Sequence, residues 1–396
     1  MKNVEGRPKP RTGDHGAGEH SAGEQGAGEG GADEQGAAPP SGGAPGASSA
    51  PVAGPARSVT IVDVARHAGV SKTTASDALS GAGRVSARTR ARIEEVAARL
   101  GYHPNTAARH LRNSRVGAVG LYLPRQVMGT GFYMEFAFGV AERARAAGLD
   151  LTLLGPDSSG VKAPRLRVDG LIILDPILDD PVVADLLGGG VPVVTVGYHR
   201  GSGPTPRGVL SADHVETTNL LLEHLGSRGA TMPGLIMPDG DFLTDWSLTL
   251  QETYERWCSA HGVEPATRGV AVDASPETLD AVVRDLMASR PDLDALVCAP
   301  DGSALRALGT LRSLGRRVGE ELLLASCVAS QSLEMCDPPI TAVDLRPRAY
   351  GVSAAELLAE ILAADAADDE PVRRVHPTEL RIRASTGSEP AGPARQ

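Results

Sequence analysis

Residues 60–80 of the chain read T-I-V-D-V-A-R-H-A-G-V-S-K-T-T-A-S-D-A-L-S. Apolar residues recur at helical spacing after Thr60, which is a good N-cap, until Gly69 breaks the helix. Ser71 then caps a second helix. Two short helices joined by a tight turn form a helix-turn-helix, so this stretch predicts a DNA-binding domain.

A third helix and a short fourth segment follow the quoted stretch. Ser86 caps the third helix, which stops at Gly101, and Pro104 separates it from the segment Asn105–Arg112. Because the N-terminus of a recognition helix enters the major groove, we expect base contacts from the small polar start of the second helix. The side chains expected at base edges are Lys72, Thr73 and Thr74, and those expected at phosphates are Arg84, Ser86 and Thr89.

Charge is distributed unevenly along the 396 residues. The formal net charge of the whole chain is −10, yet residues 57–115 hold eleven lysines and arginines against four acidic residues. A compact basic block on an otherwise acidic chain is typical of nucleic-acid binding. The partner that this pattern predicts is double-stranded DNA.

Several classes of protein are excluded by what the sequence lacks. No apolar run is long enough for a membrane span, and no apolar signal core lies near the N-terminus. The four cysteines form no C-x-x-C pair, which disfavours zinc ribbons and redox motifs. We therefore expect a cytoplasmic protein that has no contact with a membrane and needs no metal or cofactor.

The rest of the chain divides by composition. Residues 1–57 are rich in Gly, Ala, Glu and Pro and residues 386–396 form a short tail, so both are expected to be disordered. From residue 116 to 385, apolar runs alternate with amphipathic stretches, which predicts parallel sheets in two lobes. The strands expected are Ala118–Leu123, Asp150–Leu154, Gly170–Leu174, Pro192–Val196, Gly234–Met237, Gly269–Val272, Ala295–Cys298 and Leu322–Ser326. The helices expected between them include Phe132–Ala147, Glu216–Arg228, Thr249–His261, Pro276–Ser289 and Ser303–Leu314.

The quoted stretch, with R-V-S-A-R-T-R and L-G-Y-H-P-N-T-A-A-R-H-L after it, closely resembles the lactose-repressor family of bacterial regulators from Thr60 to Arg112. Weaker similarity extends through about Ala384. The resemblance implies an all-α helix-turn-helix domain over residues 58–104, a hinge over 105–115 and an α/β two-lobed periplasmic-binding-protein-like effector domain over 116–385. It implies crossings between the lobes near Ser211–His214, Val343–Arg346 and Pro371–His376, a return helix Tyr350–Leu362, and a second-lobe strand Glu379–Arg383.

The resemblance also implies roles for single residues. The recognition helix would carry Ser71, Lys72, Thr73, Thr74, Ser76 and Asp77, and the DNA backbone would be touched by Thr60, Arg84, Ser86, Thr89 and Tyr102. The hinge helix begins at Asn105, Ala108 allows a close approach to the minor groove, and Leu111 is the apolar wedge between base steps. A homodimeric repressor on a near-palindromic operator, controlled by a small-molecule effector, is the function implied.

Asp77 departs from the family pattern, in which arginine or another base-reading side chain is common. A carboxylate cannot read guanine and repels phosphate, although it accepts hydrogen bonds from cytosine or orients a neighbouring arginine. We therefore expect an operator that differs from the usual family sequence at this position, and we do not assign Asp77 a direct base contact.

By resemblance, the cleft between the lobes holds the effector. Its expected lining residues are Phe132, Tyr133, Tyr198, Asp213, Asp245, Trp246, Asp301 and, at the end of the loop from Ser326, Gln331. Aromatic faces stack on sugar rings or bases, and carboxylates accept hydrogen bonds from hydroxyl groups. Leu250 stands where relatives typically have arginine, and the sugar-binding acid expected near Val328 is absent. The pocket is therefore either adapted to a less polar ligand or no longer controlled by one.

Two other classes of function compete with a regulator. An enzyme is disfavoured because the chain has no G-x-S-x-G, Walker A or H-E-x-x-H motif and no cluster of metal ligands. A transport solute-binding protein would carry a signal peptide and lack the basic helix-turn-helix. The remaining alternative is a DNA-binding regulator that acts without any ligand.

Overall fold

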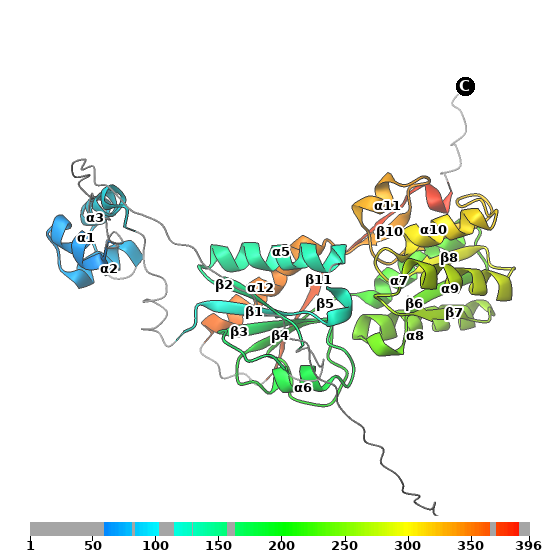
Figure 1. Cartoon of the computed structure of the whole chain (residues 1–396), viewed down its shortest axis with the longest axis horizontal. Helices are drawn as coiled ribbons and strands as arrows, with labels where there is room; N and C mark the ends of the chain where they lie inside the picture. The colour runs from blue at the N-terminus through cyan, green and yellow to red at the C-terminus, as the bar shows by residue number, and fades with distance from the viewer. Residues whose placement is uncertain are drawn as a thin grey trace, which may run out of the picture. The chain divides into compact units, whose positions relative to one another are not determined.

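The computed structural model describes residues 59–80, 84–102, 115–128, 130–156, 163–364 and 370–387. These residues form a three-helix unit and a larger α/β part with two sheets (Figure 1). The predicted tail 1–57, the hinge segment Asn105–Arg112 and most of the tail 386–396 lie outside the described residues.

The three-helix unit follows the predicted caps. Its helices are α1 (Ile61–Ala68), α2 (Lys72–Ser80) and α3 (Ala87–Leu100). The Ser71 hydroxyl accepts the Thr74 N–H at 3.0 Å, and the Ser86 hydroxyl accepts the Thr89 N–H at 3.2 Å. Gly69 ends α1 with φ at 63°, a left-handed conformation that costs glycine nothing. The sequence thus sets the ends of these helices locally.

The first lobe is a sheet of six parallel strands in the order β11-β5-β4-β3-β1-β2. Helices α5 and α12 pack on one face, and α6 packs on the other (Figure 1). Its elements are β1 (Ala118–Tyr122), η1 (Arg125–Val127), α5 (Gly131–Ala146), β2 (Asp150–Leu154), β3 (Gly170–Leu174), α6 (Pro181–Leu187), β4 (Val193–Val196), β5 (Gly208–Ala212), α12 (Pro347–Ala363) and β11 (Val372–His376).

The second lobe repeats this plan in the order β12-β10-β9-β8-β6-β7, with only β12 antiparallel to its neighbour. Helices α7 and α8 pack on one face, and α9, α10 and α11 pack on the other. Its elements are α7 (His214–Ser227), β6 (Pro233–Pro238), η2 (Gly240–Phe242), α8 (Asp245–His261), β7 (Ala266–Val270), α9 (Pro276–Ser289), β8 (Ala295–Cys298), α10 (Ser303–Ser313), β9 (Leu323–Ser326), α11 (Gln331–Met335), β10 (Thr341–Asp344), β12 (Glu379–Arg381) and η3 (Ala384–Thr386).

The chain crosses between the lobes three times. The first crossing follows β5 and the second follows β10, both where they were predicted. The third follows β11, so the predicted crossing at Pro371–His376 is wrong by a few residues. Val372–His376 is instead an edge strand that pairs with β5. Its mixed sequence V-R-R-V-H lacks the continuous apolar run of a buried parallel strand, which is why the pattern did not reveal it.

Other predicted boundaries also need correction. Strands β5 and β10 were not predicted, because their sequences G-V-L-S-A and T-A-V-D lack a continuous run of large apolar residues. Helix α6 was not predicted either, because its seven residues are too few to show a helical period. Helix α8 begins at Asp245 rather than Thr249, because Thr244 and Ser247 form a capping box there. Strand β7 spans Ala266–Val270 rather than Gly269–Val272. Strand β12 and the return helix α12 confirm the expectation for the C-terminal part.

Two glycines allow α5 and α12 to cross in direct backbone contact. A Cβ atom on Gly351 of α12 would overlap the backbone oxygen of Phe136, and one on Gly139 of α5 would overlap the backbone oxygen of Arg348. Both glycines are buried, and the side chains around them belong to the core of the first lobe. No larger residue fits at either position without moving one helix.

We therefore predict that Gly351→Ala lowers the free energy of unfolding by at least about 1–3 kcal/mol, because overpacking forces a backbone shift. Gly309→Ala is the matched control, since Gly309 is an exposed glycine within α10 whose added Cβ meets nothing within 4 Å. This second change should stabilise the protein by roughly 0.5–1 kcal/mol. Urea denaturation of both variants measures the difference, and equal effects would show that the helix crossing is loose.

Candidate functional site

The N-terminal end of α2 forms an exposed polar surface. Lys72 and Thr73 are exposed, whereas Ala75 and Ala78 on the opposite side are buried in the core of the three-helix unit. The alanines let α2 pack closely on its neighbours while its first turn stays open. Arg84 and Arg88, around the start of α3, are exposed as well. This arrangement suits a negatively charged partner that approaches the starts of α2 and α3.

The other residues predicted to contact DNA differ in their exposure and in their hydrogen bonds within the protein. Ser71 and Ser86 are exposed, and each hydroxyl is shared with a threonine hydroxyl at 2.8 Å. The Thr60 hydroxyl donates to Asp63 at 2.7 Å. Tyr102 is half-buried against the core of the unit, and Ser76 is half-buried on α2. Asn105, Ala108 and Leu111 lie outside the described residues.

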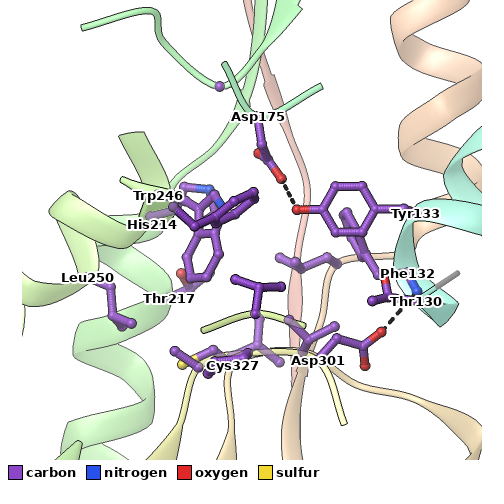
Figure 2. A pocket seen from close by; sticks show the side chains of 18 of the residues that line it. Thr130, Phe132, Tyr133, Asp175, His214, Thr217, Trp246, Leu250, Asp301 and Cys327 are labelled. Carbon is purple, nitrogen blue, oxygen red and sulfur yellow. Dashed lines mark hydrogen bonds between the residues drawn. The ribbon is translucent and has the colours of Figure 1, made fainter. Parts of the chain in front are cut away.

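A pocket lies between the two lobes of the α/β part, at the carboxyl ends of the strands. Residues that follow strands of both sheets and residues at the first two crossings contribute to its wall. Figure 2 shows the side chains that enter it from helices, such as Tyr133 of α5, Thr217 of α7 and Trp246 of α8. Ligand sites of open α/β sheets lie at this edge, because helix starts and strand ends converge there. Its apolar lining residues are Phe132, Leu174, Leu221, Phe242, Trp246, Leu250, Val272, Ala299, Val328, Val343 and Leu345.

A buried hydrogen bond joins two polar groups in this wall. The Tyr133 hydroxyl, at the start of α5, donates to Asp175 Oδ2 at 2.5 Å (Figure 2). Burial raises the pKa of the Asp175 carboxyl to about 7; the Tyr133 hydrogen bond opposes this rise, and the charge of Asp245 adds to it. The pocket therefore contains a carboxyl group that changes its charge near neutral pH.

The His214 side chain, at the start of α7, also lines the pocket (Figure 2). Burial lowers its pKa to about 4, although the nearby carboxylates of Asp245 and Asp213 favour the charged form. The imidazole is therefore neutral at neutral pH. A neutral imidazole offers one hydrogen-bond donor and one acceptor to a ligand.

An arginine joins the lobes beside the pocket. Arg200, in the segment after β4, donates to Asp245 Oδ1 and Thr249 Oγ1, each at 2.7 Å, and to Glu252 Oε1 at 2.9 Å. All three acceptors lie on α8 of the second lobe. Asp245 is only 8% exposed, so Arg200 is the cation that compensates a carboxylate held away from solvent.

A second contact between the lobes involves Asp301. Its Oδ2 atom accepts the backbone N–H of Phe132 at 3.1 Å, at the first turn of α5 (Figure 2). A carboxylate is favourable there because the N-terminus of a helix carries partial positive charge. Asp301 therefore helps to close the lobes as well as lining the pocket.

Four of the predicted effector residues line the pocket: Phe132, Tyr133, Trp246 and Asp301. The structure does not place the other four in its wall. Asp213 caps α7 by accepting the Glu216 N–H at 2.9 Å, and Asp245 pairs with Arg200. Tyr198 is 40% exposed, and Gln331 is exposed at the start of α11. The predicted loop Ser326–Gln331 nevertheless contributes Cys327 and Val328 to the pocket wall.

Sequence reasoning missed six polar residues of the wall: Thr130, Asp175, His214, Thr217, Thr218 and Tyr350. Asp175 directly follows the apolar run that forms β3, a position at a strand end that could have identified it. His214 and Thr217 gave no such signal, because their places depend on how α7 packs. Among the described residues, no group of His, Cys, Asp or Glu is arranged to hold a metal ion, and no described helix could cross a membrane.

The three-helix unit and the α/β part each match a known protein family. Residues 60–105 match the model of bacterial regulatory proteins of the lacI family, and residues 222–386 match a periplasmic binding protein-like domain. The HTH-type transcriptional regulator CelR of Thermobifida fusca is 30% identical over 344 residues, which cover 83% of this chain and 98% of CelR. The lactose operon repressor of Escherichia coli K12 is 25% identical over 324 residues, or 76% of this chain and 84% of the repressor.

Solved structures show the same architecture. A CelR–cellobiose complex has a TM-score of 0.58 and 26% identity, and the match covers 83% of this chain and 99% of that one. The lac repressor dimer bound to operator and the anti-inducer ONPF has a TM-score of 0.66 and 22% identity, over 84% of this chain and 100% of that one. The second likeness supports the fold alone.

We predict that Arg200→Ala loosens the closure of the lobes, because it removes three hydrogen bonds and leaves Asp245 without its cation. Arg268→Ala is the matched control: Arg268 pairs with Asp285 at 2.7 Å and with Ser289 inside the second lobe. Small-angle X-ray scattering should give a larger radius of gyration for Arg200→Ala only. An equal radius for both variants would contradict a role of Arg200 in closure.

We further predict that Asp175→Asn stabilises the protein at about pH 8 and not at about pH 4. A carboxyl whose pKa is raised from 3.8 to about 7 destabilises the folded state increasingly as pH rises between these values, and the penalty then stays constant. Removing the charge should recover up to about 4 kcal/mol above pH 7. Thermal unfolding across this pH range measures the effect, and a gain independent of pH would contradict it.

Proposed function

The chain belongs to the lacI family of bacterial regulatory proteins and is a DNA-binding transcriptional regulator, and we propose that it is a repressor controlled by a small molecule in the pocket between its lobes. The proposal places it in the cytoplasm as a homodimer, with one half of a near-palindromic operator for each subunit. It assigns the chain no catalytic activity. The observation that carries it is the exposed start of α2, where Lys72 and Thr73 project from a helix packed through its alanines.

The proposed contacts divide into two groups. Base edges are assigned to Ser71, Lys72, Thr73, Thr74 and Ser76 at the start of α2, and phosphates to Thr60, Arg84, Ser86, Thr89 and Tyr102. Asn105, Ala108 and Leu111 are assigned to a hinge that lies against the minor groove, where the Leu111 wedge bends the DNA. Asp77, half-buried on α2, is assigned no direct base contact.

The proposed control acts through the two contacts between the lobes. Arg200 and Asp301 hold the lobes together at the pocket, so a ligand that binds between them favours one degree of closure. A change of closure moves the first lobe relative to the second and thereby alters the dimer contacts and the order of the hinge. The ligand can shift this equilibrium only by its difference in affinity for the two states.

The test of function is retention of genomic fragments by the purified full chain at near-physiological salt. We expect enrichment of a short near-palindrome upstream of a gene cluster, whose genes then indicate the ligand. Retention without any sequence preference would overturn the assignment of a specific operator, because phosphate contacts alone give non-specific binding.

We predict that Lys72→Ala weakens binding to the enriched operator by roughly tenfold to a hundredfold, because a base contact at the start of α2 is lost. Arg99→Ala, an exposed arginine in the last turn of α3, makes the same change of charge away from α2 and is the control. Fluorescence anisotropy with operator and scrambled duplexes measures both variants. If both variants lost the same affinity for the operator, Lys72 would act only through its positive charge and not through a base contact.

A further inference from the structure

A second cavity, which we call the outer cavity, lies next to the pocket between the lobes. Phe242 and Val272 line both spaces, so the two are neighbours. The charged residues that line the outer cavity are Asp180, Asp239, Asp273 and Arg125. Three carboxylates against one guanidinium give the outer cavity a negative charge. Such a cavity attracts cations and repels anions.

The inner pocket has the same sign of charge. Its described lining residues include Asp175 and Asp301 and no lysine or arginine. His214 adds no positive charge at neutral pH, because burial holds its pKa at about 4. An anionic ligand would therefore meet two carboxyl groups and no compensating cation in a poorly hydrated space. The pocket excludes carboxylates and phosphates on this ground.

Most polar groups of the inner pocket already have partners in the protein. The Tyr133 hydroxyl donates to Asp175, and Asp301 accepts the Phe132 N–H. The Thr218 hydroxyl donates to the His214 carbonyl at 2.6 Å. What remains in the wall is chiefly acceptor capacity, on the Asp175 and Asp301 carboxyl groups and the neutral His214 imidazole, which favours a ligand that donates hydrogen bonds. The wall suits an apolar body with one polar end.

We propose that the effector is a lipophilic amine, whose apolar body packs among Phe132, Trp246 and Leu250 and whose ammonium group pairs with Asp175. This deepens the proposed function and rests on it. The ammonium group has three N–H donors, for which the Asp175 carboxylate and the neutral His214 imidazole are acceptors in the same wall (Figure 2). Phe132 and Trp246 line the same pocket and offer aromatic surface to the apolar body of the amine.

The test is isothermal titration calorimetry on the full chain at about pH 8 with matched probes. One set is 2-phenylethylamine, 2-phenylethanol and phenylacetate, a second is hexylamine, hexanol and hexanoate, and cellobiose is the sugar probe. We expect each amine to bind at least about tenfold more tightly than its alcohol, and the carboxylates not to bind. The proposal is overturned if an alcohol or carboxylate equals its amine, if cellobiose binds more tightly than the amines, or if no probe binds.

A substitution at Asp175 tests whether this carboxyl group pairs with the amine. Asp175→Asn keeps the shape of the side chain and removes its charge, so the affinity for each amine should fall to that for its alcohol. Asp185→Asn, an exposed position on α6, is the control and should bind as the unaltered chain does. An amine preference that survives in Asp175→Asn refutes the pairing.

Failure of this inference can be told apart from failure of the proposed function. The retention of genomic fragments is measured without any probe, so its outcome is obtained independently of the amine titrations. If a near-palindrome is enriched and the amines do not bind, the proposed regulator function is supported and the proposed class of ligand is wrong. If no sequence is enriched and the amines bind, the proposed amine site is supported and the assignment of a specific operator is wrong.

Discussion

The direct backbone contact between α5 and α12 is the constraint on which the ligand pocket depends. Gly139 and Gly351 let the two helices cross without intervening side chains. The start of α5 then presents Tyr133 to the pocket, and α12 presents Tyr350, whose hydroxyl accepts the Ala212 N–H at 2.9 Å at the first crossing. A shift of either helix would move the aromatic wall and the crossing together, because interiors are close-packed and transmit strain.

Charge is arranged differently in the two functional regions. Around the starts of α2 and α3, Lys72 and Arg84 are exposed and therefore hydrated, which suits a partner that releases counterions on binding. Between the lobes, the carboxyl group of Asp175 is buried, and its pKa of about 7 shows how much its charge costs there. Exposed charges thus stay hydrated and available to a partner, whereas a buried carboxyl group is ionised only at a cost in free energy.

The contacts between the lobes connect the pocket to the proposed control of DNA binding. Asp301 joins the start of α5 to the second lobe, and Arg200 joins the first lobe to α8. Both contacts lie next to the pocket wall, so a ligand that changes the position of Trp246 on α8 acts on the same helix that Arg200 holds. A local change in packing can in this way alter the closure of the lobes.

The sequence by itself determined the three-helix unit, since Ser71, Ser86 and Gly69 fix helix ends through bonds within a few residues. It also determined the alternation of strands and helices, because buried parallel strands are continuous apolar runs. Only the tertiary structure decided which polar residues meet in the pocket. Asp175 and Tyr133 are 42 residues apart in the chain, and the crossing of α5 over the sheet brings them together. Edge strands such as β11 were decided there too, because their pairing comes from a distant neighbour rather than from their own pattern.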